Sequence, residues 1–138
     1  VDADAILSER VPKICTAKGI GFMTVLSVLA ETQCFKLVTK QKQLASYAGY
    51  DIVFNDSGLK KGKTSISKKG NRFLRNAVFM PALAACRYNP ILKDFYQRLI
   101  AKGKNKKLAL IAVARKLLLL IYSLWKNNST FDPNYKSA

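Results

Sequence analysis

The fold is decided by the stretch KLALIAVARKLLLLIYSLWK, residues 107–126. Apart from its two ends, its only charged residues are Arg115 and Lys116, so a helix formed here is apolar nearly all round. Such a helix is typical of a protein core, where every side meets other apolar groups. Because the two charges interrupt the apolar run, we do not expect it to span a membrane. The stretch predicts a central core helix.

Five further helices are predicted to pack around the central one. Their apolar residues recur at helical spacing, and signals such as Gly49 after one helix and Asn89-Pro90 before another mark their ends. Pro81 lies inside one of them and is expected to kink or split it. The expected ranges are about 2–13, 22–30, 40–48 (capped by Thr39), 67–87 and 90–102. The sequence therefore predicts an all-α fold, a compact bundle of about six helices.

Two smaller features are predicted between these helices. Ala17-Lys-Gly-Ile-Gly21 gives the pattern of a helix-hairpin-helix element, whose glycines let the backbone approach a phosphate. A plain turn between two helices is the alternative, and Lys18, Gly19 and Gly21 are the candidate phosphate contacts. Residues 50–66 contain short β-branched runs, which predict a small β-hairpin or an ordered loop.

The composition points to one domain with a nucleic-acid partner. Among 138 residues, 24 are basic and 8 acidic, which gives a formal net charge of +16, and 49% are hydrophobic. A folded domain of this charge repels itself unless a polyanion binds it, with a membrane surface as the lesser alternative. There is no histidine, and the three cysteines lack Cys-x-x-Cys spacing, so we expect no metal site and a cytoplasmic location. Residues 127–138 are polar and are expected to form a loose tail.

The most basic segment follows Asp56, after which no acidic residue occurs until Asp94. Two interpretations compete: a loop that binds phosphates and carries a nucleophile, or a solvated lysine loop without a task. Two arginines fall in the first turns of the following helix, where cations oppose the helix dipole unless an anion is bound. The candidate nucleic-acid contacts here and in a second basic cluster are Lys60, Lys61, Lys63, Lys68, Lys69, Asn71, Arg72, Arg75, Lys104, Lys106 and Lys107.

Ser57 is the candidate nucleophile at the head of this segment. A serine hydroxyl is a weak nucleophile that needs a base, a metal or a strongly cationic pocket. Without histidine the chain cannot build a Ser-His-Asp triad, so attack on a phosphodiester would depend on the surrounding lysines and arginines. Asp56-Ser57-Gly58 is also a good turn sequence, which is the structural alternative, and Ser65 and Ser67 are rival serines.

Several blocks of residues, in order, carry a resemblance to a known family. Over residues 11–132 the chain resembles the C-terminal transposase domain of the Piv-related, bridge-RNA-guided insertion-sequence transposases. Cys15 to Lys18 depart from the family pattern, which usually reads Pro-Gly before Ile-Gly. The blocks that match are Gly19-Ile-Gly21, Lys42 to Gly49, Ser57-Gly58, Ile66 to Asn71, Leu74-Arg75 and Val113 to Leu117.

The resemblance implies a function and a set of partners. Residues 1–138 would be a single C-terminal transposase domain, acting with an N-terminal RuvC-like domain whose acidic residues bind Mg²⁺. Ser57 would be the nucleophile for DNA strand cleavage and exchange, with DNA and a structured guide RNA as partners and a homo-oligomer as the working state. We expect the isolated chain to be inactive in cutting, since it lacks those carboxylates. The alternatives are a non-catalytic helix-hairpin-helix module that binds DNA or RNA, and an assembly domain that only neutralises RNA.

Overall fold

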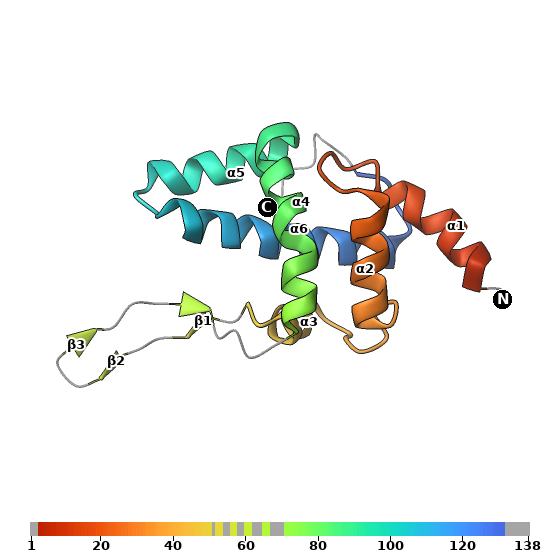
Figure 1. Ribbon diagram of the computed structural model, residues 1–138, viewed down its shortest axis with the longest axis horizontal. Helices are drawn as coiled ribbons and strands as arrows, with labels where there is room; N and C mark the ends of the chain where they lie inside the picture. The colour runs from red at the N-terminus through yellow and green to blue at the C-terminus, as the bar shows by residue number, and fades with distance from the viewer. Residues whose placement is uncertain are drawn as a thin grey trace.

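The computed structural model describes residues 3–50 and 71–131, together with the backbone of four two-residue strands between them. Within these residues the chain forms a mostly α-helical bundle, which confirms the predicted fold class (Figure 1). Its six helices are α1 (Ala3–Ile14), α2 (Phe22–Thr32), α3 (Gln41–Ala48), α4 (Arg72–Tyr88), α5 (Pro90–Ala101) and α6 (Lys106–Asn127).

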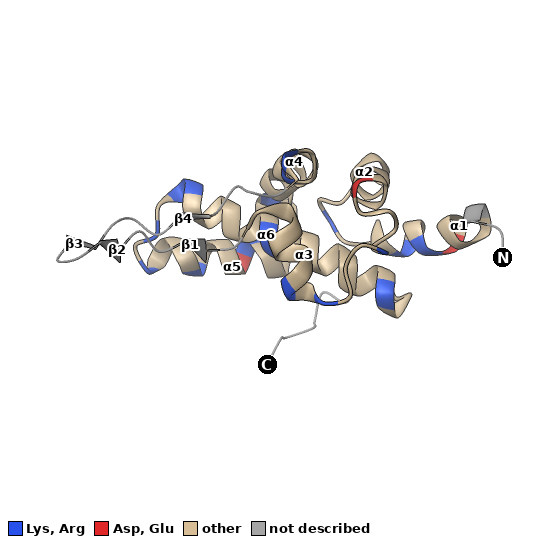
Figure 2. Cartoon of the chain, turned by 90° about the horizontal axis from the view of Figure 1, so that it is seen from below, with Lys and Arg blue, Asp and Glu red and all other residues tan. Residues whose placement is uncertain are grey.

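Helix α6 is the centre of the bundle, as its sequence predicts. It packs against α1, α3, α4 and α5, while α2 and α4 lie side by side and cross it on one face (Figures 1 and 2). Among the described helices, α6 alone is long and apolar enough to cross a membrane, and half of that stretch is buried inside the bundle. Of its two interior charges, Arg115 is exposed, and the Lys116 ammonium lies 4.2 Å from the centre of the Phe95 ring. Burial lowers the pKa of Lys116.

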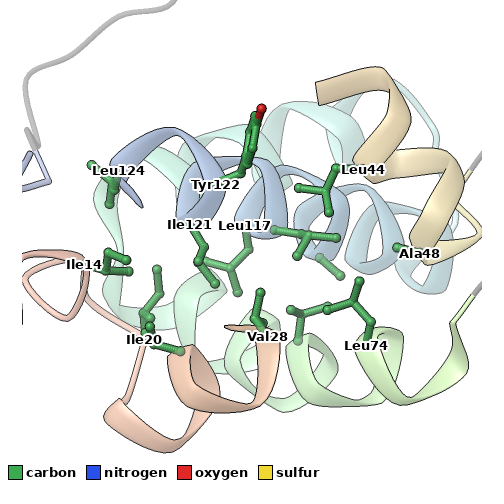
Figure 3. Close-up of a cluster of buried hydrophobic side chains, with 14 of the residues drawn as sticks. Ile14, Ile20, Val28, Leu44, Ala48, Leu74, Leu117, Ile121, Tyr122 and Leu124 are labelled. Carbon is green, nitrogen blue, oxygen red and sulfur yellow. The ribbon is translucent and has the colours of Figure 1, made fainter. Parts of the chain in front are cut away.

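One hydrophobic core joins the helices. Figure 3 shows side chains of α1, α2, α3, α4 and α6 directed into one cluster, whose largest aliphatic members are fully buried. Burial of a large aliphatic side chain stabilises a fold by about 1.5–3 kcal/mol, so this cluster holds the layers together. These core residues are Ile14, Val28, Leu44, Leu74, Leu117 and Ile121.

The helix ends agree with the sequence prediction at two positions and differ at two others. Gly49 ends α3 in the left-handed conformation, and the Asn89 Oδ1 atom caps α5 by accepting from the amides of Ile91 and Leu92. The prediction that Thr39 caps α3 is wrong, because Lys40 holds the cap position and Thr39 bonds to the Gln43 side chain instead.

Helix α4 also differs from its prediction. It begins at Arg72, later than expected, and it is not split at Pro81. A proline removes one hydrogen bond from a helix, but the buried residues Val78 and Ala82 on either side keep the helix continuous against the core.

Short strands occupy part of the segment between α3 and α4. Strand β1 (Ile52–Val53) pairs antiparallel with β4 (Ser65–Ile66), and β2 (Asp56–Ser57) pairs antiparallel with β3 (Lys60–Lys61). The other residues of 51–70 lie outside the described part of the chain, so the small hairpin or ordered loop expected at 50–66 stays a prediction.

The predicted tail begins at the last residue of α6. Asn128 ends that helix, and its side chain contacts Lys13 and Glu9 of α1. The amide of Phe131 donates to the Thr16 hydroxyl at 2.8 Å, so residues 128–131 lie against the first helix and its turn. Residues 132–138 lie outside the described residues.

Candidate nucleic-acid interface

The basic segment 51–70 leaves and re-enters the bundle at one place, where the end of α3 meets the start of α4. The Asn71 amide donates to the Tyr47 carbonyl at 2.8 Å, and the Arg75 guanidinium donates to the Ala48 carbonyl at 2.9 Å. Tyr50, the last described residue before the segment, is buried, and its amide donates to the Ala45 carbonyl. These contacts, which we name the clasp, fix both ends of the segment that carries Ser57.

Asn71 is the central residue of the clasp. Its Oδ1 atom accepts from the Leu74 amide at 3.0 Å and so caps α4. Its Nδ2 atom donates to the Glu31 carboxylate at 2.8 Å and to the Tyr47 hydroxyl at 3.4 Å. The Tyr47 hydroxyl in turn donates to the Glu31 carbonyl at 2.8 Å. Asn71, predicted as a nucleic-acid contact, therefore has a structural role, since its side chain is bonded within the protein.

The two arginines at the start of α4 have different surroundings. Arg72 is exposed, and its guanidinium carbon lies 5.4 Å from the centre of the exposed Phe73 ring. Arg75 is half-buried in the clasp and close to Tyr50. Burial raises the pKa of Tyr50 to about 12, an effect that the nearby Arg75 charge opposes. Arg72 is thus available to bind a phosphate, whereas the Arg75 guanidinium is bonded to the Ala48 carbonyl within the clasp.

Cations at helix N-termini recur across the bundle. None of the helices α2 to α6 has an acidic residue in its first turn. Three of these helices start with a basic residue instead: Lys40 caps α3, Arg72 opens α4 and Lys106 opens α6. A cation next to the positive end of a helix dipole is unfavourable by about 0.3–1 kcal/mol. A bound polyanion would offset this cost at each of these sites.

For Ser57, Lys60 and Lys61 the structure gives the position of the backbone in two short strands. Ser57 lies in β2 directly opposite Lys60 in β3, and Asp56 lies opposite Lys61. The rival Ser65 lies in β4. The rival Ser67 and three predicted contacts lie outside the described residues; the three contacts are Lys63, Lys68 and Lys69.

The Gly-x-Gly turn between α1 and α2 contains two glycines in different environments. Gly19 has a φ of +94°, and a Cβ atom placed there would lie 2.8 Å from the backbone of Ala85 in α4. Gly21 caps α2 in an extended conformation and faces open space, with no side chain capping the helix amides. The exposed Lys18 presents its carbonyl to the Asn89 side chain at 3.2 Å. Gly19 thus serves helix packing, and Gly21 leaves the α2 amides open to a phosphate.

The second basic cluster lies at the turn between α5 and α6 (Figure 2). Gly103 bends the chain there with a φ of +87°, and the Asn105 side chain caps α6 by accepting from the Lys107 amide at 2.8 Å. No acidic residue lies in this turn. The exposed lysines of the cluster are Lys102, Lys104, Lys106 and Lys107.

The described residues contain no group of three or more His, Cys, Asp or Glu side chains that could hold a metal ion. The three cysteines, Cys15, Cys34 and Cys86, are free thiols, and burial raises the pKa of Cys15 and Cys86.

Two features of this interface were missed in the sequence. The Glu31–Tyr47–Asn71 network joins residues 16 to 40 positions apart, which no local pattern shows. A local signal for its capping part did exist, because an asparagine directly before an apolar helical run is a typical N-cap. The second missed feature is the contact of Asn89 with the Gly19 turn. The sequence identifies Asn89 as a helix cap, but it does not show that this buried side chain also donates to the Lys18 carbonyl.

Comparison with known proteins gives the chain a family. The Transposase IS116/IS110/IS902 family matches residues 11–97. The chain is 37% identical to the pilin gene-inverting protein of Moraxella bovis over 129 residues, covering 91% of this chain and 40% of that protein. Its identity to the pilin gene-inverting protein of Moraxella lacunata is 38%, with coverage of 91% and 40%. The transposase for insertion sequence element IS1111A of Coxiella burnetii is 26% identical, with coverage of 94% and 36%.

The chain therefore spans about two fifths of the length of these relatives. The family match and the relatives' names agree with the resemblance carried by the sequence blocks, from the Gly19 turn to Val113–Leu117 of α6. On this match, the chain belongs to the IS116/IS110/IS902 family of transposases.

Proposed function

We propose that this chain is the domain of a DNA recombinase that supplies Ser57 as the nucleophile for strand cleavage and exchange. The observation that carries the proposal is the clasp, the set of hydrogen bonds that fixes both ends of segment 51–70. The chain also belongs to a family of transposases. A segment with five lysines between its ends is held at a single place on the helical bundle, and Ser57 lies within that segment. A nucleophile must be held within reach of the reacting phosphate, which a loop fixed at both ends achieves better than a free one.

The chemistry conserves the phosphodiester bond energy. The Ser57 Oγ atom attacks the phosphorus, a phosphoserine bond forms, and a sugar oxygen leaves with a proton as a free hydroxyl. In the joining step a sugar hydroxyl attacks the same phosphorus, and the serine hydroxyl is released. Negative charge builds on the phosphoryl oxygens in both steps, and lysines and arginines stabilise it. In this proposal that role belongs to Lys60, Lys61 and Arg72 together with the other cations of the segment.

The proposal assigns Mg²⁺ to another part of the protein. When bound, the ion would supply charge stabilisation and activate the attacking and leaving oxygens. The described residues of this chain offer no set of ligands for it, and no step is assigned to a metal held here. Acidic residues of a RuvC-like domain, DNA, a guide RNA and further protomers complete the proposed working state.

The test is strand exchange by a longer recombinase that contains this domain. Ser57→Ala should abolish strand exchange and leave DNA binding intact, because it removes one oxygen from the proposed reacting group. Ser65→Ala and Ser67→Ala are the matched controls and should retain exchange. Exchange by Ser57→Ala, or full loss in Ser67→Ala alone, would assign the nucleophile elsewhere. If the wild-type longer recombinase binds DNA but performs no strand exchange, the result would support the non-catalytic binding module instead.

A further inference from the structure

The outer face of α4 exposes side chains that the bundle does not use. Helix α4 packs on α6 with one side, and Figures 1 and 2 show its opposite side turned away from α6. On that side exposed positions recur every three or four residues, as expected for one face of a helix. These exposed residues are Arg72, Phe73, Asn76, Phe79, Met80, Leu83 and Arg87. We call this surface the outer α4 face.

The outer α4 face combines aromatic rings with arginines. Phe73 and Phe79 are 62% and 44% exposed, values unusual for phenylalanine unless a partner covers the ring. Arg72 and Arg87 lie at its two ends, and the Arg72 guanidinium already pairs with the Phe73 ring. An exposed arginine–phenylalanine pair offers a flat surface and a positive charge at the same point, and both suit a nucleotide.

Charge decides which partner fits the face. Helix α4 contains no acidic residue, so a second copy of this chain would bring arginine against arginine in a protein with a net charge of +16. A polyanion meets no such repulsion. In a duplex the bases are stacked on each other, whereas unpaired bases are free to stack on exposed rings.

We propose that the outer α4 face binds unpaired nucleotides of a single-stranded nucleic acid. Their bases stack on Phe73 and Phe79, and their phosphates pair with Arg72 and Arg87. This inference rests on the proposed nucleic-acid function, and it adds a ligand class and a binding surface that adjoins the Ser57 segment, with Arg72 common to both. Met80 and Leu83, which follow Phe79 on the same exposed face, supply apolar contact for the base edges.

The test separates bases from phosphates. The probes are a single-stranded DNA of about 16 nucleotides, the same strand with abasic sites at its centre, and the matching duplex. The abasic strand keeps every phosphate and loses only bases. The wild-type chain should bind the intact strand more tightly than the abasic one, by about tenfold for each base that stacks.

The variant Phe73→Leu/Phe79→Leu keeps apolar side chains and removes the flat rings. It should lose the preference for the intact strand and keep wild-type affinity for the abasic strand and the duplex. Leu37→Ala, at a 49% exposed aliphatic residue outside α4, is the control and should behave as wild type. Circular dichroism checks that each variant folds. A second control, Phe79→Tyr, keeps an aromatic ring and should keep the preference for the intact strand.

Three results would overturn this inference alone. One is equal binding of intact and abasic strands by wild type, which leaves the proposed function standing because duplex binding persists. Another is an equal loss for all three probes in the double variant, which indicates a general effect. The third is binding that does not depend on the bases, combined with self-association of the wild-type chain in the ultracentrifuge. If the double variant abolishes that self-association, the face binds a protein partner. Failure to bind any of the three probes would overturn the proposed function as well.

Discussion

Replacing Gly19 by alanine should destabilise the fold far more than the same change at Gly21. The two glycines stand two residues apart in one turn and look equivalent in the sequence, where both are candidate phosphate contacts. The structure separates them. A Cβ atom at Gly19 would lie 2.8 Å from the Cα and N atoms of Ala85, whereas a Cβ atom at Gly21 meets nothing within 4 Å.

The size of the effect follows from two terms at Gly19. Its φ of +94° belongs to a region that costs an alanine about 1–2 kcal/mol. The overlap falls on backbone atoms of α4, which cannot rotate away, and forced shifts of packed elements cost about 1–3 kcal/mol. Gly19→Ala should therefore lower the free energy of unfolding by about 2–5 kcal/mol.

At Gly21 the terms are small and of opposite sign. Its φ of −94° and ψ of 165° suit any residue. Alanine is a poorer N-cap than glycine by several tenths of a kcal/mol, and the lower entropy of the unfolded alanine chain offsets about 0.4–1 kcal/mol. Gly21→Ala should change stability by less than about 1 kcal/mol.

Urea denaturation followed by circular dichroism measures both variants. The fluorescence of Trp125, the single tryptophan, gives an independent probe because its half-buried ring packs near Phe35 and Arg10 at the edge of the core. Equal stability of Gly19→Ala and wild type would refute the packing role of Gly19. Equal losses in the two variants would show that the turn, and not the contact with α4, sets the requirement for glycine.

Three further outcomes are expected. Asn71→Ala should lower the free energy of unfolding by about 1–3 kcal/mol, since it removes a helix cap and a bond to the Glu31 carboxylate. The control Asn76→Ala, at an exposed position of the same helix, should be near neutral, and similar values for both variants would contradict the structural role of Asn71. The free energy of unfolding should fall as the pH rises from about 10 towards about 12, because the pKa of Tyr50 is 10.0 in the unfolded chain and about 12 in the folded one, so the folded state favours the protonated form. Tyr50→Phe should show a smaller loss over the same range, and a loss equal to that of wild type would show that Tyr50 is not its cause. DNA affinity should fall by roughly 10³ between about 50 and 200 mM salt if about six phosphates are bound, and a flat response in a filter-binding titration would rule out the electrostatic account.

The parts of the fold that depend on local pattern could be predicted from the sequence. The apolar stretch 107–126 identified the central helix, and Gly49 and Asn89 identified helix ends, because each signal acts within a few residues. Pro81 was expected to kink or split its helix. The helix is not split, because local helix breaking competes with burial of the residues around Pro81, which the sequence does not show; the kink stays a prediction.

The candidate site could be predicted only in part. The basic composition of the segment and the identity of Ser57 come from the sequence and its resemblance. The clasp does not, because its bonds join residues that are distant in the sequence: the Asn71 amide donates to the Tyr47 carbonyl, and the Arg75 guanidinium donates to the carbonyl of Ala48, 27 residues earlier. Gly19 shows the same limit: its turn was recognised, but the reason for glycine lies in α4, which is distant in the sequence.

The central claim is that Ser57 forms the covalent bond to DNA, and the most direct measurement identifies the residue bound. A longer recombinase containing this domain is incubated with its DNA substrate, denatured, digested with nuclease and protease, and analysed by mass spectrometry. The account predicts a peptide that carries a nucleotide on Ser57, present in wild type and absent in Ser57→Ala. A nucleotide on Ser65 or Ser67, or strand exchange without any protein–DNA adduct, would contradict it.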